Sequence, residues 1–125
     1  MKIFKLKDGK KYDMGQGKTT CVISPEQGAK NITLNYAEFA PGDAFAQHVH
    51  PHSEDVIVVL EGKGVIKVEG KEYPIEAGDV VYVPPGERHG TIAGTAMTMF
   101  SCQAPPDTNL YSGKYIAGES QEGSK

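Results

Sequence analysis

The sequence predicts an all-β domain folded as a small antiparallel β-barrel or closed sandwich. Short runs rich in Val, Ile, Tyr, Phe and Thr recur along the chain, and no longer stretch has the 3.6-residue apolar repeat of an amphipathic helix. Glycine-containing turn signals separate the runs, for example at 41–43, 61–64 and 84–87. Short strands divided by such turns are typical of β-sandwiches and barrels.

We expect the strands in chain order, with bounds placed by their apolar residues. They are Thr19–Ser24, Asn31–Ala40, Ala44–His50, Val56–Leu60, Gly64–Glu69, Lys71–Ile75, Val80–Val83, Gly90–Ala93 and Ala96–Gln103. Before them, lysines alternate with Ile3, Phe4 and Leu6, which predicts an edge strand within residues 1–12.

The domain organisation follows from the length of the chain and from where the strand pattern begins and ends. The chain has 125 residues, which is enough for one hydrophobic core but not two. We therefore expect a single domain over 1–125, with the edge strand at 1–12, a barrel core at about 18–104 and an irregular tail at 105–125.

Charge and hydropathy exclude several classes of partner. The formal net charge of −3 leaves no basic surplus for phosphates, so we do not expect nucleic acid as a partner. The first residues contain no continuous apolar segment of a signal peptide, and no later stretch is as apolar as a membrane span. These patterns predict a soluble cytoplasmic protein with no membrane partner.

Histidines are the most informative residues in the sequence. His48 and His50 alternate with Val49, and residues i and i+2 of a strand project from the same face. Both imidazoles can therefore converge on one point. His89 follows a second Pro-Gly turn. Neutral imidazole binds Zn, Fe, Ni, Cu and Mn, and a carboxylate nearby adds charge.

Two spaced motifs contain these histidines. The first reads G-x₅-HVH-x₄-D-x₆-G from Gly42 to Gly62, and the second reads G-x₅-P-x-G-x₂-H from Gly78 to His89. On these motifs the chain resembles the cupin superfamily, in particular its small single-domain, metal-binding members (monocupins). The resemblance implies a jelly-roll barrel, also called a double-stranded β-helix.

The resemblance also implies a set of metal ligands. Carried over by position, they are His48, His50, Asp55 and His89. The family acid is usually Glu, so Glu54 is an alternative to Asp55, although strand alternation lets only one of the two face inward. Register counted from the first motif favours Asp55. We read His52 as exposed or beside the ligands, with a ligand role as the less favoured alternative.

Such a site implies one divalent transition metal ion, which is Mn, Fe, Ni, Zn or Co, with open positions for a ligand. Small cupins resembling this chain include dioxygenases, isomerases, lyases and decarboxylases. The first hypothesis is a metal-dependent enzyme, an oxidoreductase or an isomerase or lyase, that acts on a small polar metabolite.

Two alternatives remain open. One is a non-catalytic module that binds or senses a small molecule, and the other is a metal-free epimerase or dehydratase. A pocket of roughly 300 Å³ or more beside the metal would favour an enzyme over a binding module. We also predict a homodimer, because the edge-strand-like N-terminal segment needs a neighbour and small cupins commonly exchange such strands.

Overall fold

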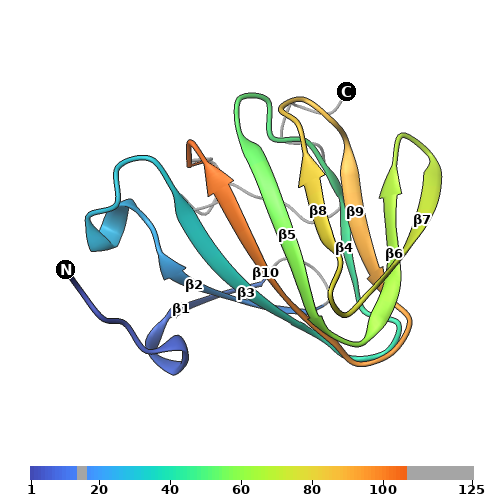
Figure 1. Ribbon diagram of the computed structural model, residues 1–125, viewed down its shortest axis with the longest axis horizontal. Helices are drawn as coiled ribbons and strands as arrows, with labels where there is room; N and C mark the ends of the chain where they lie inside the picture. Colours follow the sequence, from blue (N-terminus) through green and yellow to red (C-terminus); the bar gives the residue numbers. More distant parts are fainter. Residues whose placement is uncertain (14–16, 107–125) are drawn as a thin grey trace.

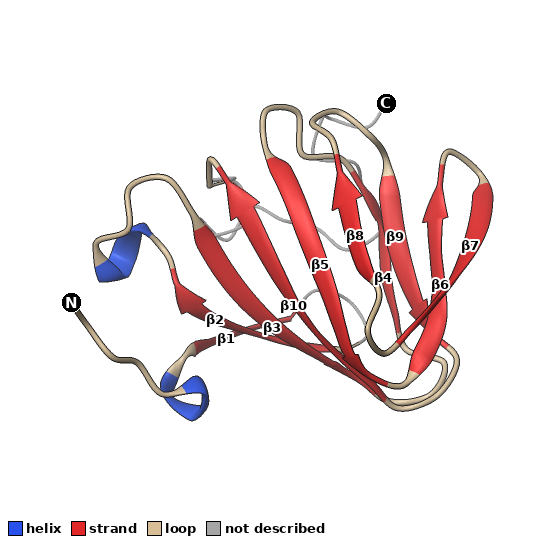
Figure 2. Ribbon diagram, in the orientation of Figure 1, coloured by secondary structure: helices blue, strands red, loops and turns tan. Residues whose placement is uncertain are grey.

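The computed structural model describes residues 1–13 and 17–106, and most of that chain is β-strand (Figures 1 and 2). The strands are β1 (Lys10–Asp13), β2 (Lys18–Ile23), β3 (Thr33–Phe39), β4 (Ala44–His48), β5 (Glu54–Glu61), β6 (Lys63–Val68), β7 (Lys71–Glu76), β8 (Val80–Val83), β9 (His89–Ala93) and β10 (Met97–Ala104). Two short 3₁₀ helices, η1 (Leu6–Asp8) and η2 (Pro25–Gln27), complete the described elements. The predicted all-β class is confirmed.

The strands form two antiparallel sheets that face each other in a jelly roll. The larger sheet has six strands in the order β1-β2-β3-β10-β5-β8, and the smaller has four in the order β4-β9-β6-β7. In the described part of the chain no strand is hydrogen-bonded into both sheets, so the predicted barrel is not a fully closed one. No helix among the described residues is long and apolar enough to span a membrane.

Each of the nine predicted strands corresponds to an observed strand, with ends that differ by a few residues. The edge strand predicted within 1–12 is mostly wrong, because its first part contains η1 and only Lys10–Asp13 pairs with β2. Among the described residues, the first ones have no strand to pair with because β2, the partner of β1, ends. β2 stops at Ile23, and Pro25 then begins η2. The predicted tail at 105–125 lies outside the described residues from position 107 onward.

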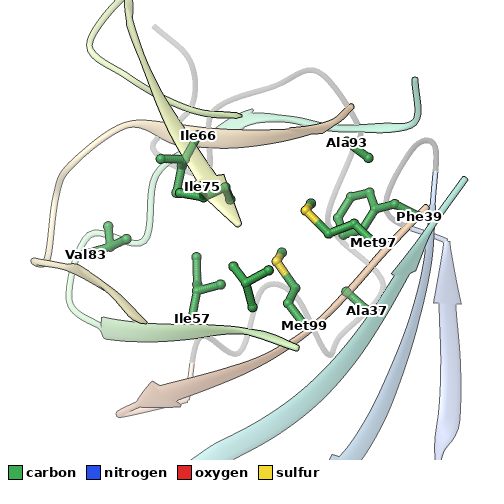
Figure 3. Close-up of a cluster of buried hydrophobic side chains, with 10 residues drawn as sticks. Ala37, Phe39, Ile57, Ile66, Ile75, Val83, Ala93, Met97 and Met99 are labelled. Carbon is green, nitrogen blue, oxygen red and sulfur yellow. The ribbon is translucent and has the colours of Figure 1, made fainter. Parts of the chain in front are cut away.

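The core lies between the inner faces of the two sheets. Figure 3 shows Ile66 and Ile75 of the smaller sheet on one side and Ile57 and Met99 of the larger sheet on the other. Met97 is only 1% exposed. This arrangement follows from strand alternation, which directs every second side chain inward.

The inward side chains change character along β10. Met97 and Met99 belong to the apolar core, whereas the next two inward positions of the strand are Ser101 and Gln103. The interior is therefore apolar at one end of the sheets and polar at the other. The polar end contains the candidate site.

Candidate metal centre

Three histidines meet at the polar end of the interior. His48, His50 and His89 are 6%, 4% and 2% exposed, and a potential ligand atom from each lies within 4.8 Å of the other two. The ring centroids of His48 and His89 are 4.5 Å apart, and those of His48 and His50 are 4.7 Å apart. The predicted histidines thus form one buried cluster.

Strand β4 reaches this cluster through a bulge. Phe45 pairs with Thr91 and His48 pairs with His89, so β4 has one more residue than β9 between the two pairs. Phe45 and His48 both line the interior cavity although they are three positions apart. Regular alternation would put them on opposite faces, and the bulge restores the inward direction. The predicted strand to His50 ends at His48 instead, and His50 lies just beyond it.

A glycine accommodates this bulge on the neighbouring strand. A Cβ added to Gly90 would lie 2.8 Å from the carbonyl oxygen of Phe45 and 3.0 Å from the backbone nitrogen of Gln47. Any larger residue would push the two backbones apart. Gly90 directly follows His89, so this close approach sets the distance between the histidine-bearing strands.

The turn between β8 and β9 connects the two sequence motifs. The backbone N–H of Gly86 donates a 2.9 Å hydrogen bond to the carbonyl of His50. Gly86 has a φ of +83°, which favours glycine. In Figure 1 the loop after β4 and the loop after β8 lie at the same upper end of the molecule. Two motifs that are distant in sequence are therefore in contact at the site.

The same turn fixes the tautomer of His89. Its Nδ1 lies 3.0 Å from the carbonyl oxygen of Glu87, and since a carbonyl only accepts, Nδ1 carries the proton. The lone pair of a neutral His89 is then on Nε2. Burial lowers the pKa of His89 to about 4, so the ring is neutral near pH 7. A neutral imidazole with an available nitrogen is the form that binds a metal.

The structure distinguishes between the two candidate acids. Asp55 is 4% exposed, and its Oδ2 lies 3.9 Å from Nε2 of His89. Glu54 is exposed on the other face of β5 and accepts a 2.7 Å hydrogen bond from the hydroxyl of Tyr82. The inward position of Asp55 agrees with the register argument. His52 is exposed and lies outside the three-histidine group.

Burial raises the pKa of Asp55, while a 2.7 Å hydrogen bond from Ser101 and the nearby His50 oppose that rise. A buried carboxylate is costly without a positive charge nearby, and His89 is neutral near pH 7. A divalent cation between these groups would provide the charge.

The donor set therefore fits a first-row divalent ion: three imidazole nitrogens and one carboxylate, all buried. Nitrogens bound at about 2.1 Å to one ion lie roughly 3 to 3.5 Å apart, so binding would draw the rings closer together.

A small cavity adjoins the cluster. Its volume is about 50 Å³, and its lining includes the three histidines and Asp55. Several lining residues that the sequence analysis did not single out are polar, namely Thr19, Asn35, Thr91, Ser101 and Gln103. Polar residues at inward positions of strands were the signal that could have found them. A larger hollow of about 560 Å³ lies over β6, β7 and β9, but no histidine lines it.

Comparison with known proteins agrees with the fold and the motifs. The sequence model of a protein family described as Cupin domain matches residues 35–101 of this chain, which is more than half of its length. The chain belongs to the cupin family. The matched segment includes all four residues of the candidate site, His48, His50, Asp55 and His89.

Two curated proteins are similar in sequence over part of their length. The tetracenomycin polyketide synthase protein TcmJ of Streptomyces glaucescens is 34% identical over 74 residues, which is 58% of this chain and 50% of that protein. The dimethylsulfoniopropionate lyase DddW of Ruegeria pomeroyi is 35% identical over 75 residues, 60% of this chain and 49% of that protein. The chain thus spans about half the length of these curated relatives.

A solved structure is similar over most of the described fold. The polyketide cyclase RemF of Streptomyces resistomycificus superimposes with a TM-score of 0.70 at 26% identity, over 84% of this chain and 79% of that one. The match to the Cupin domain family and this superposition together confirm the predicted cupin fold.

Proposed function

We propose that this cupin is a metal-dependent enzyme that acts on a small polar substrate at a divalent ion held by His48, His50, His89 and Asp55. The observation that carries the proposal is the buried cluster, in which ligand atoms of the three histidines lie within 4.8 Å of one another. Asp55 adds a carboxylate at the edge of that cluster. Four donors leave room in the coordination shell of an octahedral ion for a substrate oxygen.

The residues of this chain have separate roles in the proposal. His89 presents Nε2 because its Nδ1 proton is engaged by the carbonyl of Glu87. Ser101 holds Oδ1 of Asp55, which orients the carboxylate and raises its share of the charged form. A bound ion would supply Lewis-acid chemistry, or oxygen chemistry if the ion is iron.

The cavity limits the size of the substrate. Since a cavity needs roughly 10 to 15 Å³ to hold one water, about 50 Å³ accommodates a few waters or a ligand of similar size. This is smaller than the roughly 300 Å³ expected of a metabolite pocket. The substrate in the proposal is therefore smaller than a sugar or an aromatic polyketide.

The small cavity also favours a second candidate function, namely a module that captures a small anion at the ion without turnover. The name of one relative, the oxalate-binding protein of Thermotoga maritima, is consistent with such a role, and that protein is 39% identical over 49 residues. For the enzyme, the relatives leave the reaction open among lyase, dioxygenase and isomerase types. The dimethylsulfoniopropionate lyase and the quercetin 2,3-dioxygenase of Bacillus subtilis represent the first two.

The test begins with elemental analysis of untagged protein beside the His50→Ala variant. We expect one equivalent of a transition metal in the parent and a large loss in the variant. The metal-loaded parent is then incubated with panels of small hydroxy acids, keto acids and thioether acids, with oxygen consumption followed if iron is found. Absence of metal after reconstitution would overturn both candidate functions. Binding without turnover across the panels would favour the binding module.

A further inference from the structure

We infer that the inner face of the larger sheet, opposite the histidines, recognises a second polar group of the ligand, and that the ligand is a small monocarboxylate with an uncharged hydroxyl or carbonyl group. The inference rests on the proposed function, because the carboxylate would be bound at the ion. The recognising residues are Thr19, Asn35 and Gln103, called here the polar wall.

The polar wall is part of the same cavity as the histidines. Thr19, Asn35 and Gln103 all line it, and they are 4%, 7% and 2% exposed. They come from β2, β3 and β10, which are adjacent strands of the six-stranded sheet (Figure 1). The histidines come from β4, its following loop and β9, so the cavity has a cluster of potential ligands on one side and hydrogen-bonding groups on the other.

Register explains why the wall is there. Thr19 is opposite Ala37 on the neighbouring strand, and Gln103 is opposite Asp55. The wall residues therefore occupy inward positions that would ordinarily hold core side chains. Asn35 and Gln103 offer amide groups that both donate and accept hydrogen bonds, and Thr19 offers a hydroxyl that does the same.

The hydroxyl of Thr19 is the most direct evidence for a bound ligand. Its Oγ1 is buried and has no hydrogen-bond partner in the described structure, and Thr19 is one of the residues that line the cavity. Burying a hydroxyl without a partner costs free energy, which a ligand hydroxyl or carbonyl would recover. Thr33 offers a comparison within the chain, because its Oγ1 is also buried and unpartnered but does not line the cavity.

The net charge of the metal-loaded cavity determines which small acids can bind there. Asp55 is the only carboxylate among the described residues that line the cavity, and none of them is Lys or Arg. A divalent ion with an ionised Asp55 has a net charge of +1, which one monoanion neutralises. A dianion would leave an excess negative charge in a buried space, which is unfavourable. The second polar group of the ligand is therefore uncharged.

The test uses Co²⁺-loaded protein, so that ligand binding is read from the visible spectrum and from calorimetry rather than from turnover. The probes are glycolate, acetate, which lacks the hydroxyl, and oxalate, which is a dianion. We expect the parent to bind glycolate about tenfold or more tightly than acetate, and more tightly than oxalate. Thr19→Val should remove most of the preference for glycolate over acetate, whereas Thr19→Ser should keep it.

Thr33→Val is the matched control, because it removes a buried hydroxyl on a neighbouring strand without touching the cavity. We expect it to keep the parent's preference. A glycolate preference that persists in Thr19→Val, or is lost equally in Thr33→Val, would overturn the inference, and so would tighter binding of oxalate. Failure of the parent to bind Co²⁺ would instead show that the proposed metal function is wrong, and the inference would fall with it.

Discussion

The carboxylate of Asp55 connects the larger sheet to the histidine cluster, because its Oδ1 accepts a 2.7 Å hydrogen bond from Ser101 while its Oδ2 lies 3.9 Å from Nε2 of His89. Asp55 and Ser101 are on paired strands, where Asp55 is opposite Gln103. Diagonal neighbours on one face of a sheet are close enough for such a contact. A short acid is thus held in a fixed orientation toward the cluster.

We predict that Asp55→Asn lowers metal affinity tenfold or more, since it removes the negative charge and leaves a neutral amide facing the histidines. Glu54→Gln is the matched control, because Glu54 is the adjacent acid on β5 but is exposed and bonded to Tyr82. We expect it to change the affinity by no more than about twofold. Competition with a chelator of known affinity measures both variants. An equal loss in Glu54→Gln would mean that the wrong acid has been assigned.

A second prediction concerns Gly90, which lies against the bulge of β4. Gly90→Ala should destabilise the fold by about 1 to 3 kcal/mol, because the new Cβ would be 2.8 Å from the carbonyl oxygen of Phe45. It should also weaken metal binding, since the neighbouring residue is His89 and the two strands must separate. Denaturant unfolding and chelator competition give the two quantities.

Gly70→Ala is the control for Gly90→Ala. Gly70 has a φ of +84° and open space around it, in the turn between β6 and β7. Its substitution should cost about 1 to 2 kcal/mol of stability through backbone strain and leave metal affinity unchanged. If Gly90→Ala lowers stability but binds metal as tightly as Gly70→Ala does, the bulge does not position the histidines.

The sequence was sufficient for the fold class and for the convergence of His48, His50 and His89, whereas the role of Asp55 as a metal ligand stays a prediction. Motif spacing placed the three histidines correctly, because turns such as the one at Gly86 leave little freedom in register. The choice of Asp55 over Glu54 followed from alternation along one strand. The bulge in β4 could not be predicted, since an extra residue depends on the fit between two strands and not on local preference.

Two further features depend on packing between distant segments. The cavity volume results from how Phe45, Met99 and the polar wall fill the interior, and no local pattern reports it. Residues 1–9 alternate like a strand but pair with no strand among the described residues, because β2 ends at Ile23. Alternation of apolar and polar residues indicates a preference for an extended backbone. A strand also needs a neighbouring strand for its backbone hydrogen bonds.

The pKa of His89 predicts a pH dependence for the metal-free protein. Burial lowers this pKa in the folded state from 6.5 to about 4. Between these values the unfolded chain binds the proton and the folded protein does not, so stability falls as pH decreases from about 6.5 to 4. The contribution is about 3 kcal/mol at most. Asp55 acts in the opposite direction, because its pKa is raised in the folded state.

Urea unfolding of chelator-treated protein at pH 7 and pH 4.5 separates the two effects when His89→Gln is measured beside the parent. We expect the variant to lose less stability than the parent over this interval, because it lacks the titrating ring. Equal losses in the two proteins would show that His89 is not held neutral by burial.

The last prediction is that the protein is a homodimer. Apolar side chains at the N-terminus are exposed in the single chain, with Met1 fully exposed, Ile3 83% exposed and Phe4 41% exposed. Packing this segment against a second copy would remove that surface from water, which is favourable in proportion to its area. Light scattering should give twice the mass of one chain for the parent and a lower mass for an Ile3→Ser, Phe4→Ser double variant.

Val80→Ser on β8, where Val80 is 66% exposed, is the control for loss of any exposed apolar residue. A monomeric parent would contradict the prediction, and a dimer lost only in Val80→Ser would place the interface at the edge of the larger sheet instead of at the N-terminal segment.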